Sequence, residues 1–172
     1  MSAWRHARAI ALLPGTAVLV VPAIILLLGD GPDVGWGLDG GLAALPVVAG
    51  AALLAGGLAM WTWTVRLLAR VGQGTLAPWD PTRRLVVAGP YRHARNPMIT
   101  AVLALLLGEA AVLGSPGLLI WVAAFFIGAW LLFVLYEEPS LERRFGDEYR
   151  EYKHHVGRWI PRRTPWSPHT EN

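Results

Sequence analysis

Four long apolar runs dominate the chain, and polar residues bound each of them. The runs cover residues 9–28, 44–68, 98–113 and 118–136. A helix of about 20 apolar residues is long enough to cross the hydrocarbon core of a bilayer. The run at 98–113 is shorter, so we expect protein to shield part of it. The pattern predicts an all-α membrane protein with four transmembrane helices in a single domain, residues 1–172.

The links between the runs add detail to this prediction. Only residues 114–117 separate the last two runs, which predicts an antiparallel helical hairpin. The second run is rich in small residues, among them Gly50, Gly56 and Gly57, and such residues let helices approach closely in lipid. We therefore expect this run to pack tightly against another helix.

After the last run the hydrophobic period changes. Over residues 140–156, apolar side chains recur at the spacing of one helix face: Leu141, Phe145, Tyr149, Tyr152 and Val156. Pro139 disfavours a helical conformation at the residue before it, so we expect the last span to close on a bend at Glu138. The pattern predicts an amphipathic helix that caps the cytoplasmic end of the bundle.

Composition narrows the class of protein. Hydrophobic residues make up 54% of the chain, charged residues 16%, and the mean hydropathy is +0.41, so we do not expect a soluble globule. The absence of cysteine excludes disulfides and thiolate metal ligands. The sequence pI of about 9.8 would suit a nucleic-acid partner. The basic residues, however, are distributed according to membrane topology and do not form one binding face. We expect neither a nucleic-acid partner nor a bound metal.

The charges are distributed asymmetrically about the four runs. All fifteen Lys and Arg residues fall on one side: two precede the first run (Arg5 and Arg8), six lie in or beside the middle connection, and seven follow the last run. Asp30, Asp33 and Asp39 lie on the other side. The positive-inside rule therefore places both termini and the middle connection in the cytoplasm, and we expect the protein in the cell's inner membrane.

This topology brings two polar clusters to the same membrane face. One is the loop 85–97, in which Gly89-Pro90 and Asn96-Pro97 enclose Tyr91, Arg92, His93 and Arg95. The other is the pair Glu137-Glu138. Two adjacent carboxylates near a helix C-terminus repel each other and oppose the helix dipole, so they need a compensating cation.

Two interpretations of the paired clusters are open. In the first, Arg92 or Arg95 neutralises Glu137 or Glu138 and clamps the hairpin. In the second, the clusters bind a ligand that carries both a cation and a carboxylate. S-adenosylmethionine has this character, with an ammonium group, a sulfonium group and a carboxylate.

The motif Gly89-Pro90-Tyr91-Arg92-x-x-Arg95-Asn96-Pro97, followed by Glu137-Glu138, resembles the isoprenylcysteine carboxyl methyltransferase and phospholipid methyltransferase family. The resemblance continues through Phe145-Gly146, Glu148-Tyr149 and Arg158-Trp159-Ile160-Pro161, and covers residues 72–161. It implies an integral-membrane enzyme that uses S-adenosylmethionine to methylate a lipophilic acceptor, which arrives from the bilayer among the membrane lipids.

The resemblance also implies which residues contact the cofactor. These are Tyr91, Arg92, His93, Arg95, Asn96, Pro97, Glu137 and Glu138. Arg95 and Glu138 would act in catalysis. Two positions depart from the family pattern, since Asn96 stands where many members have histidine and Ile99 where many have tyrosine. Asparagine cannot titrate, so acid–base chemistry is not expected at residue 96.

The acceptor is not specified by the sequence. A carboxylate acceptor needs only an orienting cation, for which Arg95 is the candidate, whereas an amine or hydroxyl must lose a proton, and Glu138 or His93 could take it. Two other functions are open: a four-helix transporter that uses Glu109, an ionisable residue inside a predicted span, and a non-catalytic membrane scaffold. The sequence does not indicate an oligomeric state.

Overall fold

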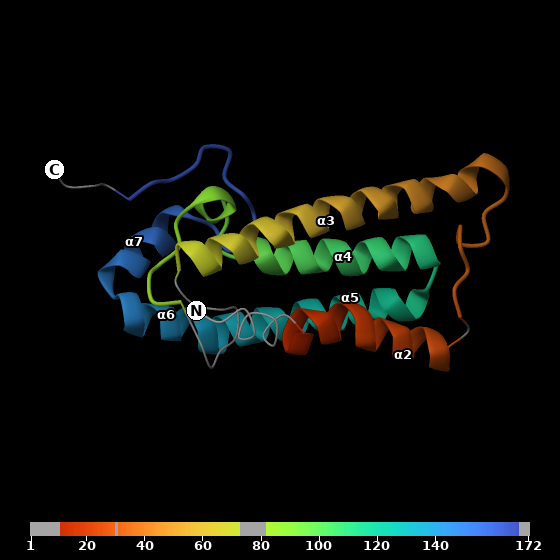
Figure 1. The fold of residues 1–172 in the computed structure, drawn as a ribbon, viewed down its shortest axis with the longest axis horizontal. Coiled ribbons are helices and arrows are strands. Elements are labelled where there is room, and N and C mark those ends of the chain that lie inside the picture. The colour runs from red at the N-terminus through yellow and green to blue at the C-terminus, as the bar shows by residue number, and fades with distance from the viewer. Residues whose placement is uncertain (1–10, 30, 73–81, 169–172) are drawn as a thin grey trace.

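The computed structural model describes residues 11–29, 31–72 and 82–168, and within these ranges all regular structure is helical. Helices α2, α3, α4 and α5 lie side by side, with α6 and α7 at one end (Figure 1). Residues 9 and 10, where the first predicted span begins, lie outside the described residues, as do Arg5, Arg8 and Asp30. The all-α prediction is confirmed for the described part of the chain.

The helices follow the apolar runs, with short turns of other helical types between them. Their bounds are Val21–Leu28 for α2, Ala44–Arg70 for α3, Pro97–Leu113 for α4, Pro116–Leu132 for α5, Glu138–Phe145 for α6 and Asp147–His155 for α7. A π-helical stretch, Ala11–Val20, precedes α2, and another, Phe133–Glu137, joins α5 to α6. Short 3-10 turns cover Gly40–Ala43 and Gly89–Arg92.

Helix α3 packs against α4 at a distance that only small residues permit. A Cβ atom on Gly50 would lie 2.8 Å from the carbonyl oxygen of Gly108, and one on Gly57 would lie 3.0 Å from that of Ala101. The tight packing predicted for this run is therefore confirmed at Gly50 and Gly57. Gly56 differs, because a Cβ atom there would meet nothing within 4 Å.

The hairpin between α4 and α5 is confirmed, and its turn is held locally. Gly114 ends α4 in the left-handed conformation (φ 60°) and donates its N–H to the carbonyl of Ala110. Ser115 then caps α5, since its hydroxyl accepts a hydrogen bond from the N–H of Leu118.

The bend expected at Glu138 is wrong, because the helical path continues through Pro139. The π-helical turn before α6 pairs the N–H of Glu138 with the carbonyl of Phe133, five residues back. Pro139 then falls in the first turn of α6, where a missing N–H costs no hydrogen bond. This turn faces Glu138 inward, where it is buried, and leaves Glu137 exposed.

The amphipathic segment expected over residues 140–156 forms two helices instead of one. Gly146, with φ 54°, separates α6 from α7, and only glycine adopts this conformation at low cost. The predicted apolar stripe nevertheless faces one core. Tyr149, Tyr152, Val156 and Trp166 are buried together, and the residues packed against them are Leu85, Val87, Leu141 and Phe145.

Two helical stretches, Gly40–Arg70 and Pro116–Phe145, are long and apolar enough to cross a membrane. Two shorter apolar helices, Pro14–Leu28 and Pro97–Leu113, accompany them. Many large hydrophobic side chains on these helices are exposed, for example Leu27 at 82% and Ile120 at 72%. This pattern is typical of helices that face lipid.

Candidate active site

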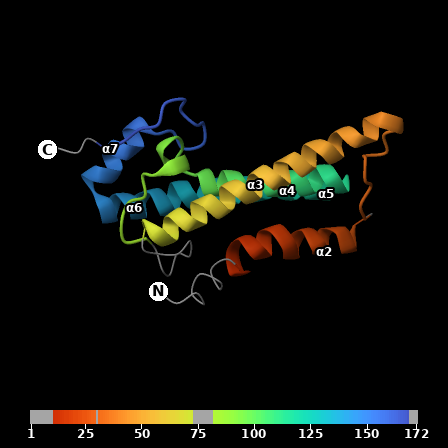
Figure 2. The same ribbon diagram turned by 45° about the horizontal axis from the view of Figure 1, so that its top comes forward.

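The loop 85–97 lies at the capped end of the bundle, against a C-terminal segment that we define as residues 156–168. In Figures 1 and 2 this loop, α7 and the C-terminal segment occupy the same end. Four backbone hydrogen bonds join loop and segment: Arg95 N to Gly157 O, Asn96 N to Arg158 O, Arg162 N to His93 O, and Trp166 N to Arg92 O. The C-terminal segment therefore fixes the conformation of the predicted cofactor loop.

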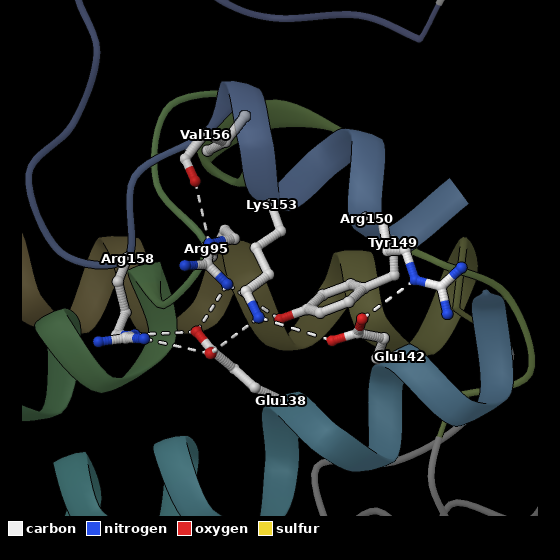
Figure 3. A network of polar contacts seen from close by, with 8 residues as sticks. All are labelled: Arg95, Glu138, Glu142, Tyr149, Arg150, Lys153, Val156 and Arg158. Atoms are coloured by element: carbon white, nitrogen blue, oxygen red, sulfur yellow. Dashed lines mark hydrogen bonds and ion pairs between the residues drawn. The ribbon is translucent and has the colours of Figure 1, made fainter. Parts of the chain in front are cut away.

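Glu138 is the centre of a buried ionic network, shown in Figure 3. Arg95 donates to its Oε1 from Nη1 at 2.7 Å. Arg158 donates to both carboxylate oxygens, at 2.9 Å and 3.1 Å. The ammonium of Lys153 lies 3.7 Å from Oε2. The side chains of Arg95 and Glu138 are only 7% and 6% exposed. We call Glu138, Arg95, Arg158 and Lys153 the Glu138 network.

The remaining donors of Arg95 are also satisfied. Its Nε donates to the carbonyl of Val156, and Nη1 also donates to the hydroxyl of Tyr149 at 3.0 Å. Burial raises the pKa of Tyr149 to about 12, against the opposing charge of Arg95, so its hydroxyl is protonated at neutral pH. The hydrogen bonds to Glu138 raise the pKa of Arg158. These contacts fit the clamp interpretation, and contact of Arg95 or Glu138 with a cofactor stays a prediction.

The two adjacent acids differ in their surroundings. Glu138 faces three cations, whereas Glu137 is exposed and forms no ion pair with any described residue. Tyr91 is buried, and burial, helped by the negative charge of Glu137, raises its pKa well above the usual value. Tyr152 donates its hydroxyl to the Tyr91 carbonyl at 2.6 Å. Glu137 is therefore the acid of the pair that no described cation neutralises.

A cavity of about 430 Å³ opens on another side of the same loop. Its walls come from α3, the loop, the start of α4 and the C-terminal segment. The described residues that line it are Met60, Trp63, Gly89, Pro90, Arg92, His93, Ala94, Pro97, Thr100, Trp159, Pro161 and Pro165. This volume is in the range of sites for small molecules and cofactors.

The polar side chains of the cavity wall are held by the C-terminal segment. Arg92 donates from Nε to the carbonyl of Trp166 at 2.8 Å and also to the hydroxyl of Ser167. His93 places Nδ1 2.8 Å from the carbonyl oxygen of Arg162. The indole N–H of Trp159 is buried and has no partner among the described residues. Such a donor costs free energy unless a ligand or water accepts from it.

Of the residues predicted to contact a cofactor, five fall in one of these two places. Arg92, His93 and Pro97 line the cavity, while Arg95 and Glu138 form the ionic network. Asn96 is buried, and its amide nitrogen has no hydrogen-bond partner among the described residues. Contact of any of these residues with a cofactor stays a prediction.

Two aromatic residues of the cavity wall were not among the predicted site residues. Trp63 belongs to α3, and a tryptophan near the end of an apolar run is typical of a membrane interface. Trp159 packs at a tilt on Phe126 of α5 and on Phe133 of the π-helical stretch that follows, with ring centroids 5.6 Å and 6.3 Å away. Its place in the motif Arg158-Trp159-Ile160-Pro161 was the one available signal for a site role.

Glu109, the residue of the transporter hypothesis, lies elsewhere. It is twelve residues along α4 from Pro97, or about 18 Å at the helical rise. One of its carboxylate oxygens is buried without a partner among the described residues, but Glu109 is not among the residues that line the cavity. A transport function stays a prediction.

Comparison with known proteins points to one family. The sequence model of the phospholipid methyltransferase family matches residues 45–148, which include α3, the loop, α4, α5 and both acids. This match confirms the resemblance found in the loop and the acid pair. No curated protein matches the chain, and no solved structure matches it.

Proposed function

The chain belongs to the phospholipid methyltransferase family, and from that premise we propose that it is an integral-membrane enzyme that methylates a lipophilic acceptor with S-adenosylmethionine. The observation that carries the proposal is the cavity of about 430 Å³ between α3, the loop and the C-terminal segment. Its wall includes Arg92, His93 and Pro97, three residues of the motif that resembles the family.

The cavity wall fits the chemistry of this cofactor. The indoles of Trp63 and Trp159 offer flat apolar surfaces for an adenine ring. The unpartnered N–H of Trp159 offers a donor, for which an adenine nitrogen or a ribose oxygen is a suitable acceptor. The guanidinium of Arg92 is a partner for a carboxylate. When bound, the cofactor supplies a methyl group that its sulfonium centre already activates.

The rest of the motif supports the cavity from outside. Arg95 and Arg158 bind the same carboxylate of Glu138 and so tie the loop and the C-terminal segment to α6. We assign Arg95 and Glu138 to positioning, because both belong to the ionic network and neither lines the cavity. The chain's own tasks are then to align the two substrates and to exclude water.

We further propose that four helical segments cross the membrane, namely Ala11–Leu28, which ends in α2, and α3, α4 and α5, with the loop, α6 and α7 in the cytoplasm. The cations of the loop and of α6 and α7 gather at one end of the bundle (Figure 1). Asp33 and Asp39 lie in the connection between α2 and α3, at the opposite end. The lipid-exposed faces of α3 and α5 would let an acceptor approach from the bilayer.

The test is binding of S-adenosylhomocysteine, measured by calorimetry on the purified protein in detergent. We expect saturable binding that weakens in Arg92→Gln, which alters the cavity wall. Arg70→Gln is the matched control, because Arg70 is an exposed arginine of α3 outside the cavity. Incubation with a labelled methyl donor and a total membrane lipid extract, followed by mass spectrometry, should then show a labelled lipid. Absence of binding by folded protein would contradict the proposal.

A further inference from the structure

His93 has one ring nitrogen committed to the backbone. Its Nδ1 lies 2.8 Å from the carbonyl oxygen of Arg162. A carbonyl oxygen only accepts hydrogen bonds, so Nδ1 must carry the proton, and in the neutral ring Nε2 then keeps its lone pair. No described residue forms a hydrogen bond with Nε2. The backbone thus selects the tautomer in which Nε2 can accept a proton.

No other described side chain of the cavity wall can accept a proton from the acceptor. Of the described residues that line the cavity, His93 alone has a side chain with a basic nitrogen lone pair. Glu138, the other candidate base from the sequence, is occupied by Arg95, Arg158 and Lys153. Asn96 cannot titrate.

We infer that Nε2 of His93 is the general base of this enzyme, which takes the proton that an amine or hydroxyl acceptor loses. This inference rests on the proposed function. The nitrogen or oxygen lone pair of the acceptor forms a bond to the methyl carbon while the carbon–sulfur bond breaks, and its electron pair stays on sulfur. The proton that the acceptor loses passes to Nε2, and the imidazolium releases it to water.

The charged groups that accompany His93 are arginines of the loop and of the C-terminal segment. Arg92 is the other charged residue of the described cavity wall, and it comes from the same loop. On the C-terminal segment, the guanidinium of Arg162 is directed to the carbonyl of His155. The residues that α3 and α4 contribute to the wall, Met60, Trp63, Pro97 and Thr100, carry no charge.

The experiment compares His93→Ala with His155→Gln. His155 is a matched control, because its Nδ1 also faces a backbone carbonyl, that of Glu151 at 2.9 Å, but it is exposed and outside the cavity. We expect kcat of His93→Ala to fall by about 100-fold or more, with affinity for S-adenosylhomocysteine within about three-fold of wild type. Added imidazole should restore part of the rate, whereas His155→Gln should keep the wild-type rate.

A second readout does not depend on activity. In protein labelled with ¹⁵N-histidine, with His93→Gln used to assign the signal, Nδ1 should carry the proton and Nε2 should be unprotonated at neutral pH. A proton on Nε2, or an unchanged kcat in His93→Ala, would overturn the role of His93 even though methyl transfer itself was observed. If wild type binds no S-adenosylhomocysteine and transfers no methyl group, the proposed function fails, and the base with it.

Discussion

The two sides of the loop differ in how completely their polar groups are paired. On the side of α6, Glu138 meets three cations and Arg95 has partners for Nε and Nη1. On the cavity side, Nε2 of His93 and the indole N–H of Trp159 have no partner among the described residues.

This difference indicates a division of labour within one short motif. A buried ion pair with all its hydrogen bonds made fixes a conformation, and disrupting one partner is costly. Unpaired donors and acceptors in a cavity are costly to the protein alone but become favourable when a ligand meets them. We therefore expect changes in the Glu138 network to affect stability, and changes in the cavity wall to affect binding.

The largest effect should come from Glu138→Ala. It leaves Arg95 and Arg158 without their shared carboxylate, and loss of one partner of a buried pair costs about 3 to 5 kcal/mol. Denaturant unfolding in detergent would measure the free energy of unfolding. Glu137→Ala is the control, because Glu137 is exposed and unpaired among the described residues, and it should change stability by less than about 0.5 kcal/mol. Equal losses in the two variants would remove the distinction between these acids.

A smaller loss is expected for Tyr149→Phe, which removes the hydroxyl that accepts from Arg95. Since the donor is charged, we expect the free energy of unfolding to fall by about 2 kcal/mol at neutral pH. The pKa of Tyr149 is about 12 in the folded protein, against an ordinary value of 10.0. The advantage of wild type is therefore complete below pH 10 and should decline as the pH rises toward 12.

Denaturant unfolding of wild type and Tyr149→Phe across this pH range would measure the difference in their free energies of unfolding. Tyr91 and Tyr152 are buried in both proteins, so their contributions to the pH dependence cancel in that difference. A difference that stays constant up to pH 12 would show that the Tyr149 hydroxyl is not buried in the folded protein.

On the cavity side, Thr100→Phe should reduce binding and leave folding intact. Thr100 lines the cavity and is exposed, so a larger side chain can occupy the cavity without displacing the core. We expect affinity for S-adenosylhomocysteine to fall about ten-fold, or about 1.4 kcal/mol, with an unchanged unfolding transition. Unchanged affinity would mean that the ligand binds outside this cavity.

The smallest effect should follow Trp159→Phe, which keeps an aromatic ring but removes the N–H. Loss of one hydrogen bond to the ligand should weaken binding about five-fold, or about 1 kcal/mol. Trp61→Phe is the control, since the indole N–H of Trp61 is also buried without a described partner, but Trp61 does not line the cavity. Equal effects of the two variants would assign the loss to helix packing.

Much of this architecture could be predicted from hydrophobic periodicity. The apolar runs gave the helices, and the four-residue link gave the hairpin. The continuation of the helix through Pro139 could not be predicted, because it depends on a π-helical turn that pairs Glu138 with Phe133. The division at Gly146 was missed because a glycine between apolar positions does not interrupt their spacing.

The candidate site was predicted in composition but not in arrangement. The motif gave Arg92, His93 and Pro97 of the cavity wall, together with the ion pair of Arg95 and Glu138. The part of the cavity wall that comes from the C-terminal segment consists of Trp159, Pro161 and Pro165. These residues approach the loop only because backbone hydrogen bonds hold the C-terminal segment against it. Contacts between residues so far apart in sequence leave no periodic signal.

The most direct test of this division is a structure of the protein in complex with S-adenosylhomocysteine. Our account places the ligand in the cavity beside Trp63 and Trp159, with the ion pair of Arg95 and Glu138 intact. A ligand bound in place of that ion pair, with Arg95 or Glu138 turned toward it and the cavity empty, would contradict the account.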